Sequence, residues 1–152
     1  MDPVAANPDR PRWLGVLAQA PCRELAAAWR ALGPVEPAAE ILRPAETGLV
    51  MLRGRAGGSG RRFNLGEMTV TRCAVRLGDG TVGHGYVQGR DKAKAELVAR
   101  LDALLQTGTH RPGLLAGLVE PLAARQETAR AALAGKAAAT RVEFFTLVRG
   151  GD

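Results

Sequence analysis

The chain has 152 residues, of which 46% are hydrophobic, 24% are charged and 4% are aromatic. These values predict one soluble globular domain with a core built mainly from Leu, Val and Ala. The net charge of +6 and the pI of about 10.3 favour an anionic partner: nucleic acid, a nucleotide, another phosphorylated ligand or an acidic protein surface. A basic surface that only maintains solubility explains the same charge.

Three features of the sequence exclude other classes of protein. The two cysteines, Cys22 and Cys73, are widely separated, which is typical of reduced intracellular thiols rather than of a disulfide framework. The N-terminal residues are polar and rich in proline, so no signal peptide is expected. No stretch approaches the ~18 apolar residues of a membrane span. We therefore expect a cytoplasmic protein without a membrane partner.

The predicted organisation is a flexible tail over residues 1–11 and a single α+β domain over residues 12–152. Residues 13–19 and 21–32 have the composition of two successive helices. Pro21 separates them, because proline fits the first turn of a helix but not its interior.

The next part of the chain is expected to form short strands. Residues 40–43 and 48–53 read as two strands joined by a turn at 44–47. Glycines make up much of residues 54–60, which predicts a flexible loop. Residues 61–65 have the composition of a further short strand that leads into the central one.

A hairpin in the middle of the chain carries the clearest strand signal. Side chains alternate with period two over residues 68–77, which puts Cys73 on the face expected to be buried as a small hydrophobe. Asp79-Gly80 then predicts a tight turn, and residues 81–87 run back as the partner strand. With the strands before it, this hairpin predicts an antiparallel sheet of four or five strands.

The last third of the chain is predicted to be mostly helical. Residues 92–106, with Asp91 as N-cap, show a full apolar stripe at helical spacing. A helical turn at 114–118 and an Ala-rich helix at 121–139 follow, and residues 141–148 read as an extended C-terminal segment. Helices before the sheet and two or three after it define an α+β fold.

The arginines of the glycine-rich loop are the first candidate site. Arg53, Arg55, Arg61 and Arg62 flank open backbone amides that could cradle phosphates, so they are candidate ligand-binding residues. The loop lacks the Gly-Lys-Ser/Thr ending of a P-loop. A solvated, mobile hairpin loop is the alternative interpretation.

Arg72 and Arg76 share one face of the central strand with Val70 and Ala74. Arginines on an otherwise apolar face need an anionic partner, so both are candidate subunit contacts. The alternative is that this face is simply exposed to solvent.

No catalytic constellation is apparent in the sequence. His84 lies between two glycines, which often mark the close approach of another backbone or a ligand. Glu46, in the predicted turn, could act as an acid but has no companion, and a turn or subunit-contact role is preferred. Cys22, at a helix N-terminus, could have a lowered pKa but has no base partner. His84 and His110 form no metal-ligand signature, so no metal site is expected and any catalytic residue stays unknown.

The C-terminal residues 140–152 form a candidate docking arm. Phe144, Phe145 and Val148 make this segment apolar, and arginines flank it. Exposed apolar segments of this kind usually mark partner contacts. These three residues are therefore candidate subunit contacts, and an enzyme acting alone is the weaker interpretation.

Several separate motifs, in order, resemble the PhnG family, a subunit of the bacterial carbon–phosphorus lyase system for phosphonate use. The resemblance spans about residues 13–150. The matching stretches are residues 43–50, 62–63, 65–67, 67–76, 79–83, 87–92 and 141–150.

This resemblance implies a subunit that pairs with itself and with the PhnH, PhnI and PhnJ subunits. Together with PhnH, PhnI and PhnL, such a subunit supports the transfer of ribose triphosphate from ATP to a phosphonate, with release of adenine, in the reaction of alpha-D-ribose 1-methylphosphonate 5-triphosphate synthase. The family assigns the nucleosidase chemistry to PhnI and carbon–phosphorus cleavage to the radical, iron–sulfur subunit PhnJ. Two cysteines are too few for such a cluster. We therefore expect an accessory subunit with no cofactor of its own, ATP being the substrate of the complex.

Two hypotheses remain open at the level of the sequence. The first is a scaffold subunit of the phosphonate-activating complex. The second is a stand-alone basic module that binds phosphate, a nucleotide or nucleic acid through Arg53, Arg55, Arg61 and Arg62. The low aromatic content argues against nucleic acid, because single-strand binding relies on stacking.

Overall fold

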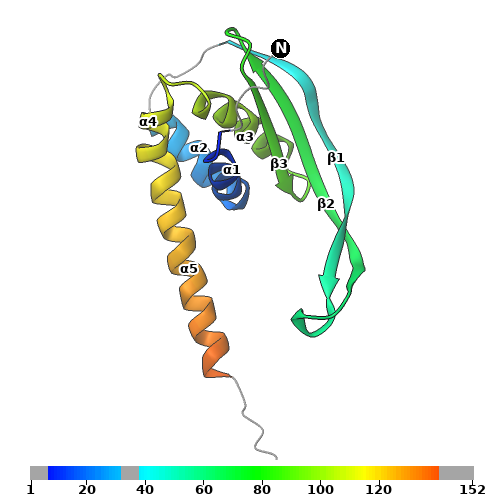
Figure 1. Cartoon of the computed structure of the whole chain (residues 1–152). Coiled ribbons are helices and arrows are strands. Elements are labelled where there is room, and N and C mark those ends of the chain that lie inside the picture. Colours follow the sequence, from blue (N-terminus) through cyan, green and yellow to red (C-terminus); the bar gives the residue numbers. More distant parts are fainter. Residues whose placement is uncertain (1–6, 32–37, 141–152) are drawn as a thin grey trace, which may run out of the picture.

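The computed structural model describes residues 7–31 and 38–140, in which helices cover one face of an antiparallel sheet (Figure 1). The elements follow one another as α1 (Arg10–Gln19), α2 (Cys22–Ala31), β1 (Ala39–Arg55), a 3₁₀ turn (Ala56–Gly58), β2 (Arg62–Leu77), β3 (Val82–Gln88), α3 (Lys92–Leu105), α4 (Arg111–Leu114), a π-helical turn (Leu115–Val119) and α5 (Glu120–Ala139). The α+β order predicted from the sequence is confirmed. The predicted extended segment at 141–148 and the docking arm beyond Thr140 lie outside the described residues.

The sheet has three strands in the order β1-β2-β3, so the prediction of four or five strands was wrong. Residues 40–43 and 48–53 belong to one long strand, and the turn predicted at 44–47 is replaced by a register shift between Arg43 and Glu46. Pro44 is tolerated there because it lies at this irregularity of an edge strand and has no partner in the register with β2. Residues 62–65 likewise continue directly into β2.

The alternation in the central strand places the core as predicted. Cys73, Val75 and Leu77 of β2 are buried, and α3 packs against this face with Val98 and Leu101 completely covered. The Asp91 carboxylate caps α3 by accepting a 2.9 Å hydrogen bond from the backbone N–H of Lys94. This sequence-predicted cap fixes where the chain turns from β3 onto the sheet.

Close packing of α3 on β3 depends on two glycines. A Cβ atom built on Gly85 would overlap the carbonyl oxygen of Ala95, and one on Gly83 would overlap that of Ala99. The prediction that glycines around His84 mark the approach of another backbone is therefore confirmed, and the backbone is that of α3.

The N-terminal helices complete the body of the protein. Trp13 and Leu17 of α1 and Leu25 of α2 are fully buried against α3 and the start of α5. Helix α1 begins at Arg10, inside the range that was predicted as a tail. The break between α1 and α2 falls at Ala20 and Pro21, as the proline predicts.

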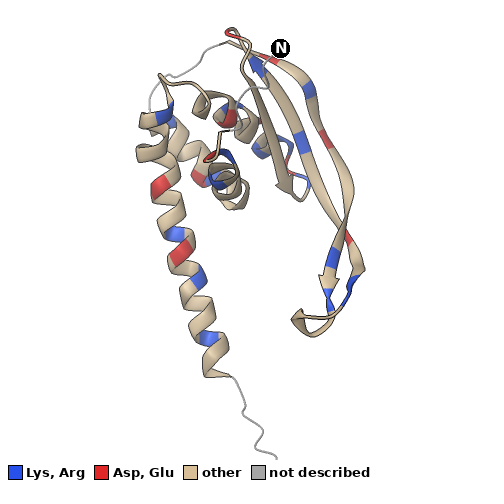
Figure 2. Ribbon diagram, in the orientation of Figure 1, with Lys and Arg blue, Asp and Glu red and all other residues tan. Residues whose placement is uncertain are grey.

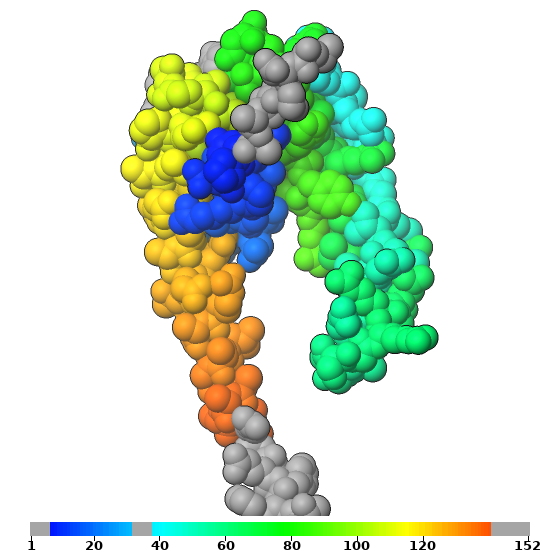
Figure 3. Space-filling view, in the orientation of Figure 1, coloured from blue at the N-terminus to red at the C-terminus, as the bar shows by residue number. Residues whose placement is uncertain are grey.

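Two elements extend beyond this body in the same direction (Figures 1 and 3). One is the outer part of the β1–β2 hairpin, residues 46–67, which we call the projecting hairpin. Nearly all of its side chains are exposed. The other is the outer half of α5, whose residues 127–139 are all exposed. Figure 3 shows open space between them in this view.

Candidate functional site

The four arginines of the predicted binding loop lie at the tip of the projecting hairpin, because β1 ends at Arg55 and β2 begins at Arg62. Figure 2 shows basic residues in this part of the hairpin. Arg55 and Arg62 are direct cross-strand partners where the two strands meet the turn, and Arg53 lies opposite Asn64. Arg61 immediately precedes β2. The structure thus brings together the residues that the sequence singled out.

The chemistry of this tip is that of an exposed cationic surface. No acidic side chain in the described residues pairs with these four arginines; the one bond made by Arg55 runs to the carbonyl oxygen of Gly60, at 3.1 Å. The backbone N–H groups of Ser59 and Gly60 both donate to the carbonyl oxygen of Ala56, so two amides of the loop close the turn instead of facing a ligand. Like charges directly opposite on a ladder repel, which an anion at the tip would relieve.

Arg72 and Arg76 find their partners within the chain. Arg72 donates to Glu46 and Arg76 to Glu40, each at 2.7 Å, across the β1–β2 ladder. All four side chains are about half exposed, so these pairs contribute little to stability. The two arginines are exposed in the described structure, whereas Val70 on the same face is buried. Subunit contact by the two arginines stays a prediction.

Glu46 lies within β1, not in a turn. Its carboxylate accepts bonds from Arg72 at 2.7 Å and Arg43 at 3.1 Å. The hydrogen bond and charge of Arg72, and then the charge of Arg43, lower the pKa of Glu46 below its ordinary value. A carboxylate held ionised in this way is a poor general acid at neutral pH.

The remaining sequence candidates form no second site. The side chain of His84 is exposed, and within residues 7–31 and 38–140 no group of three His, Cys, Asp or Glu residues could hold a metal ion. Burial and the nearby Asp91 raise the pKa of Cys22, so the lowered pKa considered for this thiol was wrong. Cys73 is buried, as predicted, and burial raises its pKa as well.

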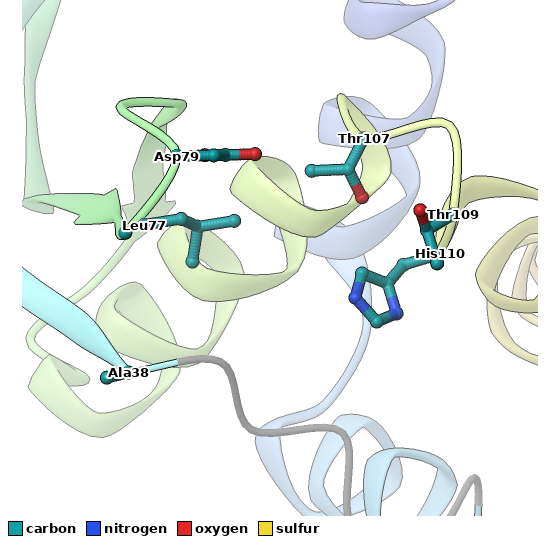
Figure 4. Close-up of a pocket in the computed structure, with 7 residues that line it drawn as sticks. Ala38, Leu77, Asp79, Thr107, Thr109 and His110 are labelled. Carbon is teal, nitrogen blue, oxygen red and sulfur yellow. The ribbon is translucent and has the colours of Figure 1, made fainter.

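A cavity of about 260 Å³ lies between the β2–β3 turn and the α3–α4 loop (Figure 4). Its lining residues are Ala38, Leu77, Gly78, Asp79, Thr107, Thr109 and His110. Asp79 accepts from the backbone of Thr81, and the Thr107 hydroxyl donates to Leu104. These polar groups already stabilise the two loops, so the cavity offers few groups that could orient a ligand.

One buried polar residue was missed from the sequence. Asp102 interrupts the apolar stripe of α3, and its carboxylate accepts hydrogen bonds from Arg10, Trp13 and the backbone of His84. An acidic residue inside an otherwise apolar helix face was the available signal, because a buried carboxylate requires partners.

The described part of the chain is thus an α+β protein with a three-stranded antiparallel sheet. It has exposed projecting elements and an arginine-rich tip. None of the helices in the described ranges has the length and apolarity needed to cross a membrane.

Comparison with known proteins identifies the family. Residues 8–150 match the family described as "Phosphonate metabolism protein PhnG". The chain is also 50% identical over 137 residues to alpha-D-ribose 1-methylphosphonate 5-triphosphate synthase subunit PhnG of Rhizobium meliloti (strain 1021), covering 90% of this chain and 86% of the relative. The chain therefore belongs to the PhnG family of phosphonate metabolism proteins.

Proposed function

We propose that this chain acts as an assembly subunit, without a catalytic centre of its own, in phosphonate metabolism. As a PhnG protein it is a subunit of alpha-D-ribose 1-methylphosphonate 5-triphosphate synthase, the multi-subunit complex that the name of its relative gives. Its partners in this proposal are PhnH, PhnI and PhnJ, with PhnL in the transferase step, and a second copy of itself. The complex works in the cytoplasm on ATP and a phosphonate, and this chain binds no cofactor.

The observation that carries the assembly role is the exposure of large parts of two elements. The projecting hairpin and the outer half of α5 both extend past the body, and most of their side chains are exposed. Exposed apolar side chains on both, including Leu65 and Leu133, resemble surfaces that a partner covers. A subunit that completes its fold in a complex accounts for these features.

The direct test is reconstitution of the synthase with and without this chain. The tagged chain is co-expressed with the other subunits, and the purified assembly is assayed for adenine release from ATP in the presence of methylphosphonate. We expect the intact chain to recover the other subunits, and assemblies lacking it to lose activity. Free chain with no bound subunit would contradict the proposal.

The candidate docking arm is tested in the same assay. Deletion of residues 141–152 is expected to reduce recovery of the other subunits if this segment docks. A deletion that left recovery and activity equal to those of the intact chain would show that assembly does not need the arm.

A second candidate function rests on the unpaired charge of the hairpin tip. Arg53, Arg55, Arg61 and Arg62 could bind the triphosphate of ATP or another polyphosphate as a stand-alone module. Such binding would weaken with salt, with a slope set by the number of phosphates neutralised. Charge reversal at Arg55 and Arg61 that left nucleotide affinity unchanged would exclude this function.

A further inference from the structure

The projecting hairpin carries exposed apolar side chains on both of its faces, although Glu67 lies opposite Met51 on the inner face. Thr47 and the buried Thr71 are cross-strand partners whose hydroxyl oxygens lie 3.2 Å apart, so odd-numbered β1 residues up to Met51 continue the face that α3 covers nearer the body. Leu49 and Met51 lie on this inner face. Both side chains remain exposed, at 62% and 52%.

The opposite, outer face of the hairpin carries a second apolar group. A Cβ atom at Gly54 would lie 3.7 Å from the Phe63 ring and 3.8 Å from Leu65, so these positions share one face. The register shift between Leu52 and Arg53 keeps Leu52 on that face as well, opposite Gly66. Phe63 and Leu65 are 45% and 65% exposed.

A ribbon with these properties needs cover on two sides. An isolated two-stranded hairpin is at best marginally stable in water, and beyond the body no third strand or helix in the described residues supports this one. Docking one face onto a flat surface would leave the other apolar face in solvent. Insertion between two walls covers both faces at once.

The charge of the tip decides what kind of partner fits. Arg55 and Arg62 face each other across the ladder, with Arg53 and Arg61 beside them and no carboxylate of the described residues in contact. The acidic side chains that the structure pairs with arginines of this chain are Glu24, Glu40, Glu46, Glu96, Asp102, Glu120 and Glu127. A second copy, with the same net charge of +6, is therefore a poor match for four more guanidinium groups.

We propose that the projecting hairpin inserts into a cleft of a different synthase subunit, one with apolar walls and a cluster of carboxylates at its base. The inference rests on the proposed function, because it requires that the chain works within a complex. Leu49 and Met51 contact one wall, Phe63 and Leu65 contact the other, and the tip arginines meet the carboxylates.

Site-specific photo-crosslinking tests insertion directly. A photoreactive phenylalanine analogue replaces Leu49 on the inner face or Leu65 on the outer face, in the full chain co-expressed with the other subunits. We expect both positions to crosslink to the same partner subunit. Adducts from only one face, or adducts with a second copy of this chain, would overturn the proposal.

Charge reversal tests the chemistry of the partner. The double variant Arg55→Glu/Arg62→Glu is compared with Arg23→Glu/Arg90→Glu, which makes the same charge change at exposed arginines of the body. At about 0.15 M salt and without ATP, we expect the tip variant to lose about tenfold in recovered partner and the control to match the unmodified chain. Equal recovery by the tip variant, or recovery by the unmodified chain only when ATP is added, would contradict a carboxylate cluster.

Two controls separate this inference from the proposed function and from misfolding. The thermal unfolding midpoint of the tip variant should equal that of the unmodified chain, because the tip makes no contact with the body. If the unmodified chain recovers no other subunit, the proposed function fails. If it recovers them and the hairpin variants do so equally, only the insertion fails.

Discussion

The indole Nε1–H of Trp13 donates a 2.9 Å hydrogen bond to a carboxylate oxygen of Asp102. Both residues are completely buried. The same carboxylate accepts from Arg10 at 2.7 Å and from the backbone N–H of His84 at 2.8 Å. Through Asp102, helix α3 is thus linked to both helix α1 and strand β3. Strand β3 is one edge of the sheet, and β1, which belongs to the projecting hairpin, is the other.

Replacing Asp102 by alanine is expected to lower the free energy of unfolding by about 3 kcal/mol, because it leaves a buried indole N–H and a backbone N–H without acceptors. Asp102→Asn keeps one acceptor oxygen and should cost about half as much. Urea unfolding followed by tryptophan fluorescence measures both. Glu127→Ala, which removes a surface pair with Arg130, is the control and should leave stability unchanged. An alanine variant as stable as the control would show that Asp102 does not hold α1 in place.

The packing of α3 on β3 predicts a sharp difference between two glycines of the same sheet. Gly85→Ala forces a methyl group into the Ala95 carbonyl, so α3 must move, at a cost of about 3 kcal/mol. Gly48 of β1 has no atom within 4 Å of the position where a Cβ would lie, so Gly48→Ala should be tolerated. Thermal unfolding of the two variants makes the comparison. Equal midpoints would mean that α3 does not approach β3 this closely.

The sequence predicted the elements whose signals are local. The Asp79-Gly80 turn, the Asp91 cap and the apolar stripe of α3 each depend on a few neighbouring residues, and each is confirmed. The number of strands was wrong because Pro44 and Gly48 look like a turn in isolation, whereas pairing with β2 keeps this segment extended. Such long-range pairing overrides local propensity.

In the candidate site, too, local features could be predicted from the sequence and long-range contacts could not. Clustering of Arg53 and Arg55 with Arg61 and Arg62 could be predicted, because a hairpin brings the two ends of its loop together. The partners of Arg72 and Arg76 could not be predicted, since Glu46 and Glu40 reach them only through the register of β1 on β2. The many bonds of Asp102 also depend on the docking of α1, which no local pattern specifies.

The ion pair between Glu46 and Arg72 predicts a pH effect at one carboxyl group. Because the folded protein lowers the pKa of Glu46, the pair favours folding above the ordinary value of 4.5, and this contribution fades as the pH falls through the lower, folded value. NMR titration of the Glu46 carboxyl carbon should give a pKa below 4.5 in the unmodified chain. Arg72→Ala should raise it, whereas Arg76→Ala should not. A pKa unchanged by Arg72→Ala would contradict the pairing.

The thiol of Cys22 is expected to react slowly with disulfide reagents. Burial raises its pKa above 9.0, and the nearby Asp91 raises it further. Asp91→Asn removes the charge, and asparagine is also a good N-cap, so α3 should remain intact. The variant should therefore show faster modification of Cys22 at the same pH, measured by mass spectrometry of the labelled peptide. Asp79→Asn, remote from this thiol, is the control, and equal rates in the two variants would argue against the influence of Asp91.

The two halves of α5 are predicted to serve different purposes. Leu122 is buried against the body and Gln126 donates a 2.8 Å hydrogen bond to Val16, whereas Leu133 is 70% exposed. Leu122→Ala should therefore cost about 3 kcal/mol of unfolding free energy. Deletion of residues 128–152 should give the same unfolding free energy as deletion of residues 141–152 alone, because residues 128–140 are exposed. Urea unfolding of these proteins separates the two roles. In the co-expressed complex we expect the reverse order, with the deletion losing more partner than Leu122→Ala, because an exposed helix without a role in stability is explained by assembly. A deletion that destabilised the body as much as Leu122→Ala would remove this reason for assigning the outer half of α5 to a partner.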